Sequence, residues 1–407
     1  MSGLSDLDIQ DDPFDYYAFQ RQKCPVWHEP DIDLYVIGGM PEARAALNDS
    51  VTFSSAPGRR GAAVNPVALA YVKALGERGW ARAVTLQRTD PPVHTKYRKV
   101  LNRVFTPGRV KLLTPGIESI VHELLAPALR AGRCEFVADF ALPLPGMFIA
   151  EQLGLDRSDY RTFRRWAEAM LCLAQRPNMT MEEAMEEVEV ELEAQHYLAA
   201  ECEKRRTQPT EDLISLIVNA NADEEPFTMN ELQDLMHQLV TGGFETTTGG
   251  LAKAMYLLAT HPEQQELLRS RPELLVNFVE ESLRFDSPVQ GLWRRASCPV
   301  SAAGVDVPEG GSVMVRFGAA NRDPRVFEDP DRFDITRENA NQHIAFGLGV
   351  HFCLGAALAR QEMLSAFRIL LESTADIALD GEVPTPMHDQ SFFLRPMKAL
   401  PIKLIAT

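Results

Sequence analysis

Residues 346–355 read Phe346-Gly347-Leu348-Gly349-Val350-His351-Phe352-Cys353-Leu354-Gly355, and a helical pattern follows at once from Ala356 to Met363. A cysteine just ahead of a helix meets unpaired backbone N–H groups and the positive end of the helix dipole. Both effects stabilise a thiolate, the form of cysteine that binds metals. A lone cysteine in a loop is more often a small buried hydrophobic residue. Here three glycines also remove side chains where a flat group could lie against the backbone, so the whole pattern favours a ligand-binding thiolate.

Composition places the chain among globular proteins and excludes several function classes. It has 407 residues, of which 45% are hydrophobic, and a formal net charge of −16. Such a chain can bury a sizeable core. Its acidic balance argues against nucleic acid as a partner, because phosphate neutralisation requires concentrated cations. The N-terminus is neither basic nor apolar and no run approaches 18 apolar residues, so we expect no signal peptide, no membrane contact and a cytoplasmic location.

The cysteines indicate a reducing compartment. None forms a CxxC pair, and they are scattered through the chain at positions 24, 134, 172, 202, 298 and 353. This usage is unlike that of a disulfide framework or a zinc site. We therefore expect neither in this protein.

Local patterns predict an α+β protein that is mostly α. Short β-like runs such as Leu34–Ile37 occur up to about Ser54, and a second β-rich stretch covers residues 300–315. Helical spacing dominates from about residue 91 to residue 284, and the tail at residues 400–405 has the pattern of a strand. No repeat or long linker interrupts the chain, so we expect one domain over residues 1–407.

One long helix is predicted over about residues 229–259. Thr228 and Glu231 form a capping-box pattern at its start, and His261-Pro262 ends it. At about 1.5 Å per residue, it would span more than about 40 Å. Its middle, residues 241–250, contains four glycines and several β-branched residues, all of which cost helix stability. Close packing against a neighbouring helix and a locally widened helix that makes room for a ligand explain these residues equally well.

The ten-residue pattern around Cys353 resembles the haem-binding signature of the cytochrome P-450 family, FGxGxHxCxG, without a departure. Three further motifs follow the family's order, so that the resemblance covers nearly the whole chain. It implies the triangular, mostly helical P-450 fold with small β-sheets, with the haem-thiolate loop and the following helix at about residues 346–371. It also implies haem b as the cofactor and Cys353 as the axial ligand of its iron.

The first further motif is Glu281-Ser282-Leu283-Arg284, which matches the ExxR pattern of the family. Residues three positions apart share a helix face, so Glu281 and Arg284 can form an ion pair. In the family, an arginine from a downstream meander joins this pair in a buried network, and the resemblance gives that place to Arg332. We expect a structural role for these residues. An ordinary surface pair, the alternative, contributes at most a few tenths of a kcal/mol.

The second motif, in residues 90–98, places His94 and Arg98 four positions apart on a helix that begins at two prolines. In the family this pair binds the haem propionates, and a cationic pair suits a carboxylate. The family's other propionate ligands correspond to Arg294 and His351. A solvated surface charge is the alternative for any one of the four residues, but it is a weak explanation for all four together.

The third motif is Gly242-Gly243-Phe244-Glu245-Thr246, which resembles the family's oxygen-binding element, AGxET or AGxDT. The resemblance makes Glu245 and Thr246 the acid–alcohol pair that delivers protons to bound dioxygen. Gly242 stands where alanine is common, and Phe244 where a polar residue is common. Neither departure affects the acid–alcohol pair, although an extra glycine could loosen the helix.

The resemblance implies a monooxygenase that inserts one atom of O2 into an unactivated C–H bond or dealkylates a heteroatom. The chain shows no flavin domain or iron–sulfur pattern, so we expect electrons from a separate ferredoxin with an NAD(P)H-dependent reductase. Arg103, Arg109, Lys111 and Arg360 are candidates for a basic docking patch, with simple solubility as an equal alternative.

Two other functions compete with this interpretation. A peroxygenase would take its oxygen from hydrogen peroxide, but the family's peroxide users typically lack the acid–alcohol pair that Glu245 and Thr246 provide. A haem-binding sensor or carrier without turnover would need neither that pair nor an apolar pocket.

By position in the family, the substrate pocket is expected to be apolar, without an anchor for an anionic substrate. A hydrophobic substrate of terpenoid, steroid or aromatic type fits such a lining. Ordinary core is the alternative for the same residues. Those expected to line the pocket are Val84, Leu86, Met236, Leu239, Gly242, Gly243, Val289, Leu292, Trp293, Phe392 and Phe393.

Overall fold

The computed structural model describes residues 3–56, 65–176, 179–220, 225–385, 387–389 and 391–407. The chain forms two compact units. We call the first the sheet unit; it comprises Met1–Ala56, Val110–Leu144 and Glu245–Thr407. The second, the helical unit, comprises Pro57–Arg109 and Pro145–Phe244. The expectation of one domain over residues 1–407 stays a prediction.

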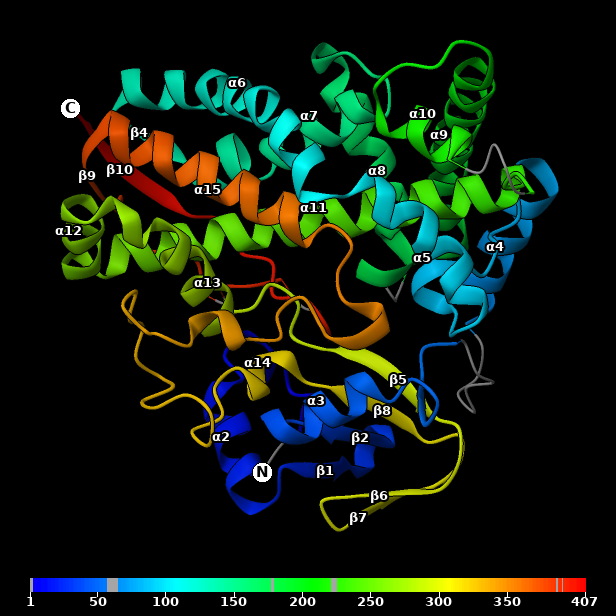
Figure 1. Cartoon of the computed structure of the whole chain (residues 1–407), viewed down its shortest axis with the longest axis horizontal. Helices are drawn as coiled ribbons and strands as arrows, with labels where there is room; N and C mark the ends of the chain where they lie inside the picture. The colour runs from blue at the N-terminus through cyan, green and yellow to red at the C-terminus, as the bar shows by residue number, and fades with distance from the viewer. Residues whose placement is uncertain (1–2, 57–64, 177–178, 221–224, 386, 390) are drawn as a thin grey trace. The chain divides into compact units, whose positions relative to one another are not determined.

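The strands of the sheet unit are β1 (Val26–Glu29), β2 (Leu34–Ile37), β3 (Phe53–Ser54), β4 (Arg133–Glu135), β5 (Leu292–Ala296), β6 (Val300–Ala302), β7 (Val305–Val307), β8 (Ser312–Val315), β9 (Thr374–Leu379) and β10 (Pro401–Ala406). The largest sheet has the order β1-β2-β8-β5-β3, in which β2 and β8 are parallel and the other neighbours antiparallel. Strands β4, β10 and β9 form a second, antiparallel sheet, and β6 pairs with β7. Figure 1 shows β1, β2 and β8 side by side.

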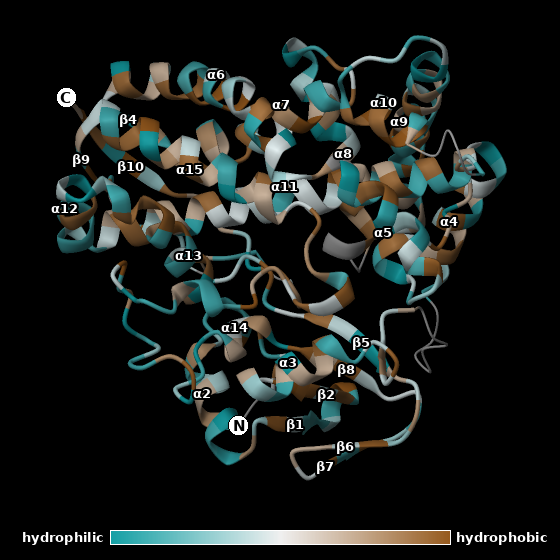
Figure 2. Ribbon diagram, viewed as in Figure 1, coloured by the Kyte–Doolittle hydropathy of each residue, from teal (hydrophilic) through white to brown (hydrophobic). Residues whose placement is uncertain are grey.

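Some helices of the sheet unit pack against these strands, as α3 (Met40–Asn48) does against β8 and α15 (Ala356–Ser373) against β9. The core of this unit includes Val313, Met314 and Val315 of β8, all fully buried, and Figure 2 shows β2 and β8 mostly in the hydrophobic colour. The helices are α1 (Leu7–Asp11), α2 (Phe14–Lys23), α3 (Met40–Asn48), most of α6 (Pro107–Ala131), α12 (Pro262–Ser270), α13 (Leu275–Phe285), α14 (Phe317–Ala320) and α15 (Ala356–Ser373).

The helical unit contains α4 (Pro66–Arg78), α5 (Val93–Val104), most of α7 (Pro143–Gln152), α8 (Tyr160–Gln175), α9 (Met181–Thr207) and α10 (Leu213–Asn219). Helix α9 packs against α4, α8 and α10. Its apolar residues Val188 and Leu192 meet Tyr71 and Leu75 of α4 in a buried cluster. The acidic first turn of α9 is closed by a capping box between Thr180 and Glu183.

The longest helix, α11 (Met229–Thr260), has 32 residues and therefore spans about 48 Å. Its first half belongs to the helical unit and its second half to the sheet unit. The predicted capping box is present, because Glu231 N–H donates to Thr228 Oγ1 and Thr228 N–H donates to Glu231 Oε2. The prediction of a mostly helical α+β protein with one long helix over about residues 229–259 is confirmed. Among the described residues, no helix combines the length and apolar character needed to cross a membrane.

Candidate active site

Cys353 lies in a tight loop that joins a short helical turn, Gly349–His351, to α15. Its backbone N–H donates to the carbonyl of Phe346 at 2.8 Å, and the side chain is half-buried. Gly347 and Gly349 adopt φ values of +68° and +67°, in the left-handed region that favours glycine. A Cβ at Gly349 would also lie 2.4 Å from the carbonyl oxygen of Leu47 in α3. The backbone of this loop therefore requires both glycines.

Gly355, the residue that precedes α15, has a different reason for being glycine. A Cβ built there meets nothing within 4 Å, so the glycine leaves open space beside the cysteine loop. The N-terminus of an 18-residue helix follows directly, and its unpaired N–H groups favour negative charge at this end. The loop thus combines a thiol, a helix N-terminus and unfilled space, as expected for a thiolate that binds a ligand.

A cluster of charged residues around Glu280 packs next to the cysteine loop. Arg360 of α15 donates to both carboxylate oxygens of Glu280 at 2.6 and 2.8 Å, and its guanidinium lies 4.4 Å from the ring centre of Phe346. His343 lies 3.1 Å from Glu280. Burial would raise the pKa of Glu280, but the hydrogen bonds from Arg360 and His343 outweigh it and hold the pKa at about 2.

This arrangement weakens the predicted basic docking patch. Arg360 is engaged with Glu280 and its side chain is only 30% exposed. Arg109 is half-buried and donates to the carbonyl of Glu211. Arg103 and Lys111 are exposed as expected, the first in the helical unit and the second in the sheet unit.

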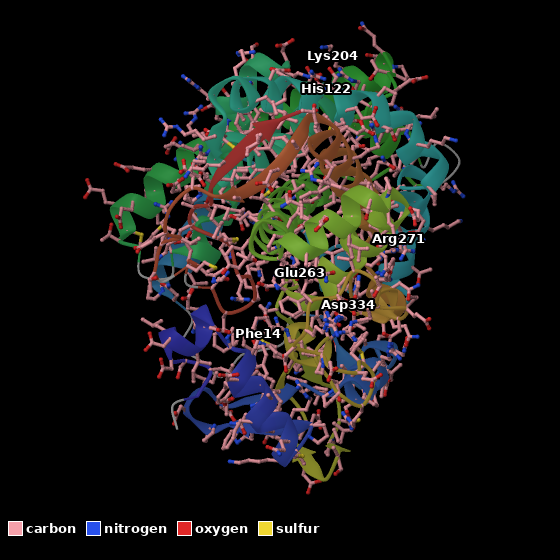
Figure 3. The ribbon with its side chains drawn as sticks, turned by 90° about the vertical axis from the view of Figure 1, so that its left-hand side faces the viewer. Phe14, His122, Lys204, Glu263, Arg271 and Asp334 are labelled. Carbon is pink, nitrogen blue, oxygen red and sulfur yellow. The ribbon has the colours of Figure 1, made fainter. Side chains whose placement is uncertain are left out.

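The ExxR pair forms a buried ion pair, with Arg284 donating to Glu281 at 2.7 and 2.8 Å and neither side chain exposed. The third member of the network is Arg337, whose Nε donates to Glu281 at 3.1 Å. The prediction that Arg332 takes this place is wrong. The side chain of Arg332 is 67% exposed and lies 3.8 Å from Asp334, which Figure 3 labels.

Arg332 contributes its backbone carbonyl to the network. That oxygen accepts hydrogen bonds from Arg284 at 3.3 Å and from Arg337 at 3.1 Å. Arg284 also donates to the carbonyls of Asn321 and Pro330. Arg284 and Arg337 therefore hold the irregular segment that contains Arg332 against α13, and this role is structural.

Most of the glycines in the middle of α11 allow close packing against neighbouring residues, which is one of the two explanations given above. Three of them are packed: a Cβ at Gly243 would lie 2.9 Å from Ile149 in the helical unit, and Cβ atoms at Gly249 and Gly250 would lie 3.3 and 3.4 Å from Pro288 and Met363 in the sheet unit. Figure 1 shows α15 alongside this second half of α11. A Cβ at Gly242 meets nothing within 4 Å, and this residue is exposed. The helix is not widened, since residues 229–260 are α-helical throughout.

Glu245 and Thr246 occupy the first turn of the part of α11 that belongs to the sheet unit, and both are half-buried. The next residue, Thr247, is buried and forms a hydrogen bond with Glu362 of α15. Burial raises the pKa of Glu362 to about 8, against the opposite effect of that hydrogen bond. Glu362 of α15 is therefore a neutral or partly neutral acid near pH 7, and its hydrogen-bond partner Thr247 directly follows the predicted acid–alcohol pair on α11.

The predicted cationic residues divide between the two units. In the helical unit, His94 is buried and Arg98 half-buried on α5, and burial together with the charge of Arg98 lowers the pKa of His94. In the sheet unit, Arg294 is buried on β5, where its guanidinium donates to the carbonyl of Trp293 at 2.8 Å. His351 ends the turn before Cys353 and is half-buried.

The predicted lining residues of the sheet unit come together at one place. The backbone pairs Val289 with Leu394, Gln290 N–H donates to the carbonyl of Phe393 at 2.6 Å, and the rings of Trp293 and Phe392 stack at 5.7 Å. The aromatic residues are half-buried and pack against a core cluster around Tyr17, so they are partly core. Leu292 is 39% exposed.

In the helical unit, Val84 is 48% exposed, and Leu86 and Leu239 are half-buried. Their place in the lining stays a prediction. Met236 is fully buried at 0% exposure, so the structure does not support its place in the lining.

A model of the cytochrome P450 family matches residues 152–403. The chain is 34% identical to 6-deoxyerythronolide B hydroxylase of Saccharopolyspora erythraea, with 99% of this chain and 100% of that protein covered. It is 36% identical to the cytochrome P450 monooxygenase PikC of Streptomyces venezuelae, with 98% and 93% covered.

The chain belongs to the cytochrome P450 family. The solved structure of the Bacillus subtilis cytochrome P450 PksS matches it with a TM-score of 0.85 at 29% identity, covering 100% of both chains. That of CYP109E1 from Bacillus megaterium in complex with corticosterone matches with a TM-score of 0.84 at 29% identity, covering 97% of this chain and 99% of that one. The P450 fold predicted from the sequence is thereby confirmed.

A cytochrome P450 is an oxidoreductase of the monooxygenase type that uses O2 and a substrate, and its cofactor is haem b. The residues of the sheet unit fit this group. Cys353 supplies a thiol at a helix N-terminus, the position that favours the thiolate form. Gly355 leaves space on the same loop, and Arg294 supplies a buried cation suited to a carboxylate.

Two residues of this P450 site were missed by the sequence analysis. Arg337 has no sequence spacing that links it to Glu281, so no local signal identifies it. Glu362 had a signal, because it lies on α15 among the buried residues Met363, Ala366 and Phe367. An acid on the apolar face of a helix has to be paired or neutral, which marks it as unusual.

Proposed function

We propose that this cytochrome P450 inserts one oxygen atom from O2 into a hydrophobic small organic molecule, by hydroxylation or dealkylation. Electrons come from a separate ferredoxin with an NAD(P)H-dependent reductase, and the protein works in the cytoplasm. The observation that carries this proposal is the cysteine loop, which presents a thiol at the start of α15 beside unfilled space at Gly355.

In this proposal, Cys353 would hold the haem iron as a thiolate, and His94, Arg98, Arg294 and His351 would bind the haem propionates. When bound, the haem would supply the chemistry that activates O2, and the Cys353 thiolate would contribute electron density to it. Glu280, which is buried, and Arg360, which is half-buried, keep the cysteine loop in place by the ion pair described above.

Glu245 and Thr246 have the role of moving protons toward O2. The hydroxyl of Thr246 orients a water molecule, and the carboxylate of Glu245 replaces the protons that this water gives up. Both side chains are half-buried, so they combine access to water with a fixed place on a rigid helix. The presence of this pair favours O2 over hydrogen peroxide as the oxidant.

The substrate is proposed to be apolar and of terpenoid, steroid or aromatic type. Support comes from the stacked pair of Trp293 and Phe392 and from the adjoining Val289 and Phe393. The related proteins are consistent with bulky substrates, since one is named as the hydroxylase of 6-deoxyerythronolide B and another was solved with corticosterone.

A spectral titration with a library of hydrophobic compounds tests the proposal, because a substrate that displaces the water ligand shifts the spin state of the iron. Compounds that bind are then incubated with ferredoxin, reductase and NADH, and product is measured. Product formation with NADH supports the proposal. Product only with hydrogen peroxide would make the protein a peroxygenase, and binding without any product would leave a sensor or carrier.

A further inference from the structure

The connection between α4 and α5 is held by side chains of two other helices. We call residues 80–89 of this connection the wall segment, because it carries the predicted lining residues Val84 and Leu86. Apart from one short turn at Leu86–Arg88, it has no helix or strand. A segment of this kind satisfies its backbone polar groups with water or with side chains.

In this protein, α9 and α11 provide those partners. Gln195 of α9 accepts from Trp80 N–H at 2.9 Å and donates to the Trp80 carbonyl at 3.2 Å. Gly79 allows this approach, since a Cβ there would lie 2.3 Å from the Gln195 amide oxygen. Farther along, Gln238 of α11 accepts from Gln87 N–H at 3.2 Å.

The strongest attachment is a buried cluster around Asp234, which is 1% exposed. Thr85, fully buried, donates its hydroxyl proton to Asp234, and Gln238 donates to both Thr85 Oγ1 and Asp234 at 2.7 and 2.8 Å. Arg88 completes the cluster with an ion pair to Asp234. We call Thr85, Arg88, Asp234 and Gln238 the clasp.

The clasp fixes the direction of the two lining residues. Thr85 is buried and faces α11. Of its neighbours, Val84 is 48% exposed and Leu86 is half-buried. Leu86 has φ +26°, an unfavourable value for a residue with a side chain. Such a conformation persists only when its surroundings impose it, and hydrogen bonds from Thr89 to the Leu86 carbonyl and from Arg88 to the Thr85 carbonyl do so here.

Little space remains behind the wall segment for it to shift. The cavity beside it, bordered by Trp80, Arg82, Asp234 and His237, has a volume of about 10 Å³, room for no more than one water molecule. Arg82 is also tied to α9 by hydrogen bonds to Glu191 at 2.7 and 2.9 Å. The wall segment is therefore preformed.

We propose that Asp234 and Gln238 are positioning residues that set substrate selectivity by fixing Val84 and Leu86. This inference rests on the proposed function, because the lining role of those two residues comes from it. Asp234 and Gln238 are four residues apart and share one face of α11, so a single rigid helix defines the position of the wall. Loss of the clasp loosens the wall and weakens the binding of bulky ligands more than that of small ones.

The test uses the haem-loaded enzyme and two variants that break the clasp, Asp234→Asn and Thr85→Val. Thr85→Ser keeps the hydroxyl and is the conservative rescue. Gln233→Ala is the matched control, because Gln233 is also buried on α11 and donates to the Gln195 carbonyl of α9 but, in the described part of the chain, makes no hydrogen bond to the clasp. Each variant is measured by amide hydrogen exchange of peptides covering residues 80–89. Binding of two azole probes, imidazole and the bulky clotrimazole, is followed by the shift of the haem absorption band.

We expect exchange in residues 80–89 to rise about tenfold or more in Asp234→Asn and Thr85→Val, because a hydrogen bond to a carboxylate is lost. Clotrimazole affinity should fall about tenfold, while imidazole affinity changes less than about twofold. Thr85→Ser and Gln233→Ala should match the parent in both measurements.

Three results would overturn the inference. They are unchanged exchange in the folded Asp234→Asn and Thr85→Val variants, a looser segment with unchanged clotrimazole affinity, and equal losses for both probes. A failure of the proposed function looks different, since the parent enzyme would then form no product with ferredoxin, reductase and NADH, while hydrogen exchange and azole binding would still report on the clasp.

Discussion

Replacing Arg337 with alanine should destabilise the protein far more than the same replacement at Arg332, although the two residues lie five positions apart in one loop. The side chain of Arg337 is 8% exposed and donates to Glu281, a carboxylate with no exposure. It also donates to the carbonyls of Glu328, Asp329 and Arg332. The side chain of Arg332, at 67% exposure, makes only a distant ion pair with Asp334.

The expected magnitudes follow from these contacts. A hydrogen bond to a charged group contributes roughly 1.5–3 kcal/mol, and complete loss of a buried charge partner costs about 3–5 kcal/mol. Glu281 keeps Arg284 in the Arg337→Ala variant, and the freed carbonyls can bind water, so we expect a loss of about 2–3 kcal/mol. Arg332→Ala retains the backbone carbonyl that the network uses, and should change the free energy of unfolding by less than about 0.5 kcal/mol.

Urea unfolding of the haem-loaded protein, followed by the haem absorption band and by circular dichroism, measures both losses. The midpoints should shift without a change in the slope of the transition. Arg337→Lys should fall between the parent and Arg337→Ala, because it keeps the charge but loses the planar fork. Equal losses for Arg337→Ala and Arg332→Ala would refute the reasoning, as would a larger loss at Arg332.

Further predictions address the haem site and one buried acid. Cys353→His should abolish the absorption band that the reduced, carbon monoxide-bound protein shows near the wavelength typical of the family, and an unchanged band would exclude Cys353 as the ligand. Replacing Arg98 and Arg294 together with leucine should weaken haem retention while the thiolate band persists; equally tight retention would show that they do not bind the propionates. Thr246→Ala should still oxidise NADH but form more hydrogen peroxide and less product, within the roughly 10²–10⁴-fold range of acid–base steps, whereas unchanged coupling in both Thr246→Ala and Thr246→Ser would remove Thr246 from the proton relay. Glu362 has a folded pKa of about 8, above its ordinary value of 4.5, so the folded state holds a proton that the unfolded chain has lost, and stability falls as pH rises from about 4.5 to 8. Glu362→Gln should therefore be more stable than the parent at pH 9, by up to a few kcal/mol, and similar to it at pH 5; the same difference at both pH values would contradict the raised pKa.

The parts of the fold that the sequence predicted have local causes. Helix α11 begins directly after Thr228 because the capping box with Glu231 satisfies two backbone groups within four residues. Strand β2 consists of the run Leu34–Ile37, whose β-branched and aromatic residues favour a strand. The cysteine loop could be recognised because Gly347 and Gly349 have to adopt positive φ values, which leaves few other residues possible there.

Residues that act through distant partners were harder to predict. A network centred on Glu281 needs cations from the meander, and the sequence there offers both Arg332 and Arg337 without indicating which side chain turns inward. The backbone decides this, because the carbonyl of Arg332 points toward Arg284 while its side chain remains in solvent. The resemblance to the family identified the correct segment but the wrong arginine, because spacing along an irregular loop does not fix the direction of a side chain.

Asp234 illustrates how such residues can still be found before a structure is known. It lies on α11 between the buried residues Leu232, Leu235 and Met236, so helical spacing alone places a carboxylate inside the protein. A buried carboxylate requires partners, because its desolvation is otherwise too costly. The sequence thus predicts that partners exist, but their identity depends on which segment the fold brings against α11. In this protein that segment carries Val84 and Leu86, the residues proposed to line the pocket, and this position is the basis of the selectivity role that we propose for Asp234.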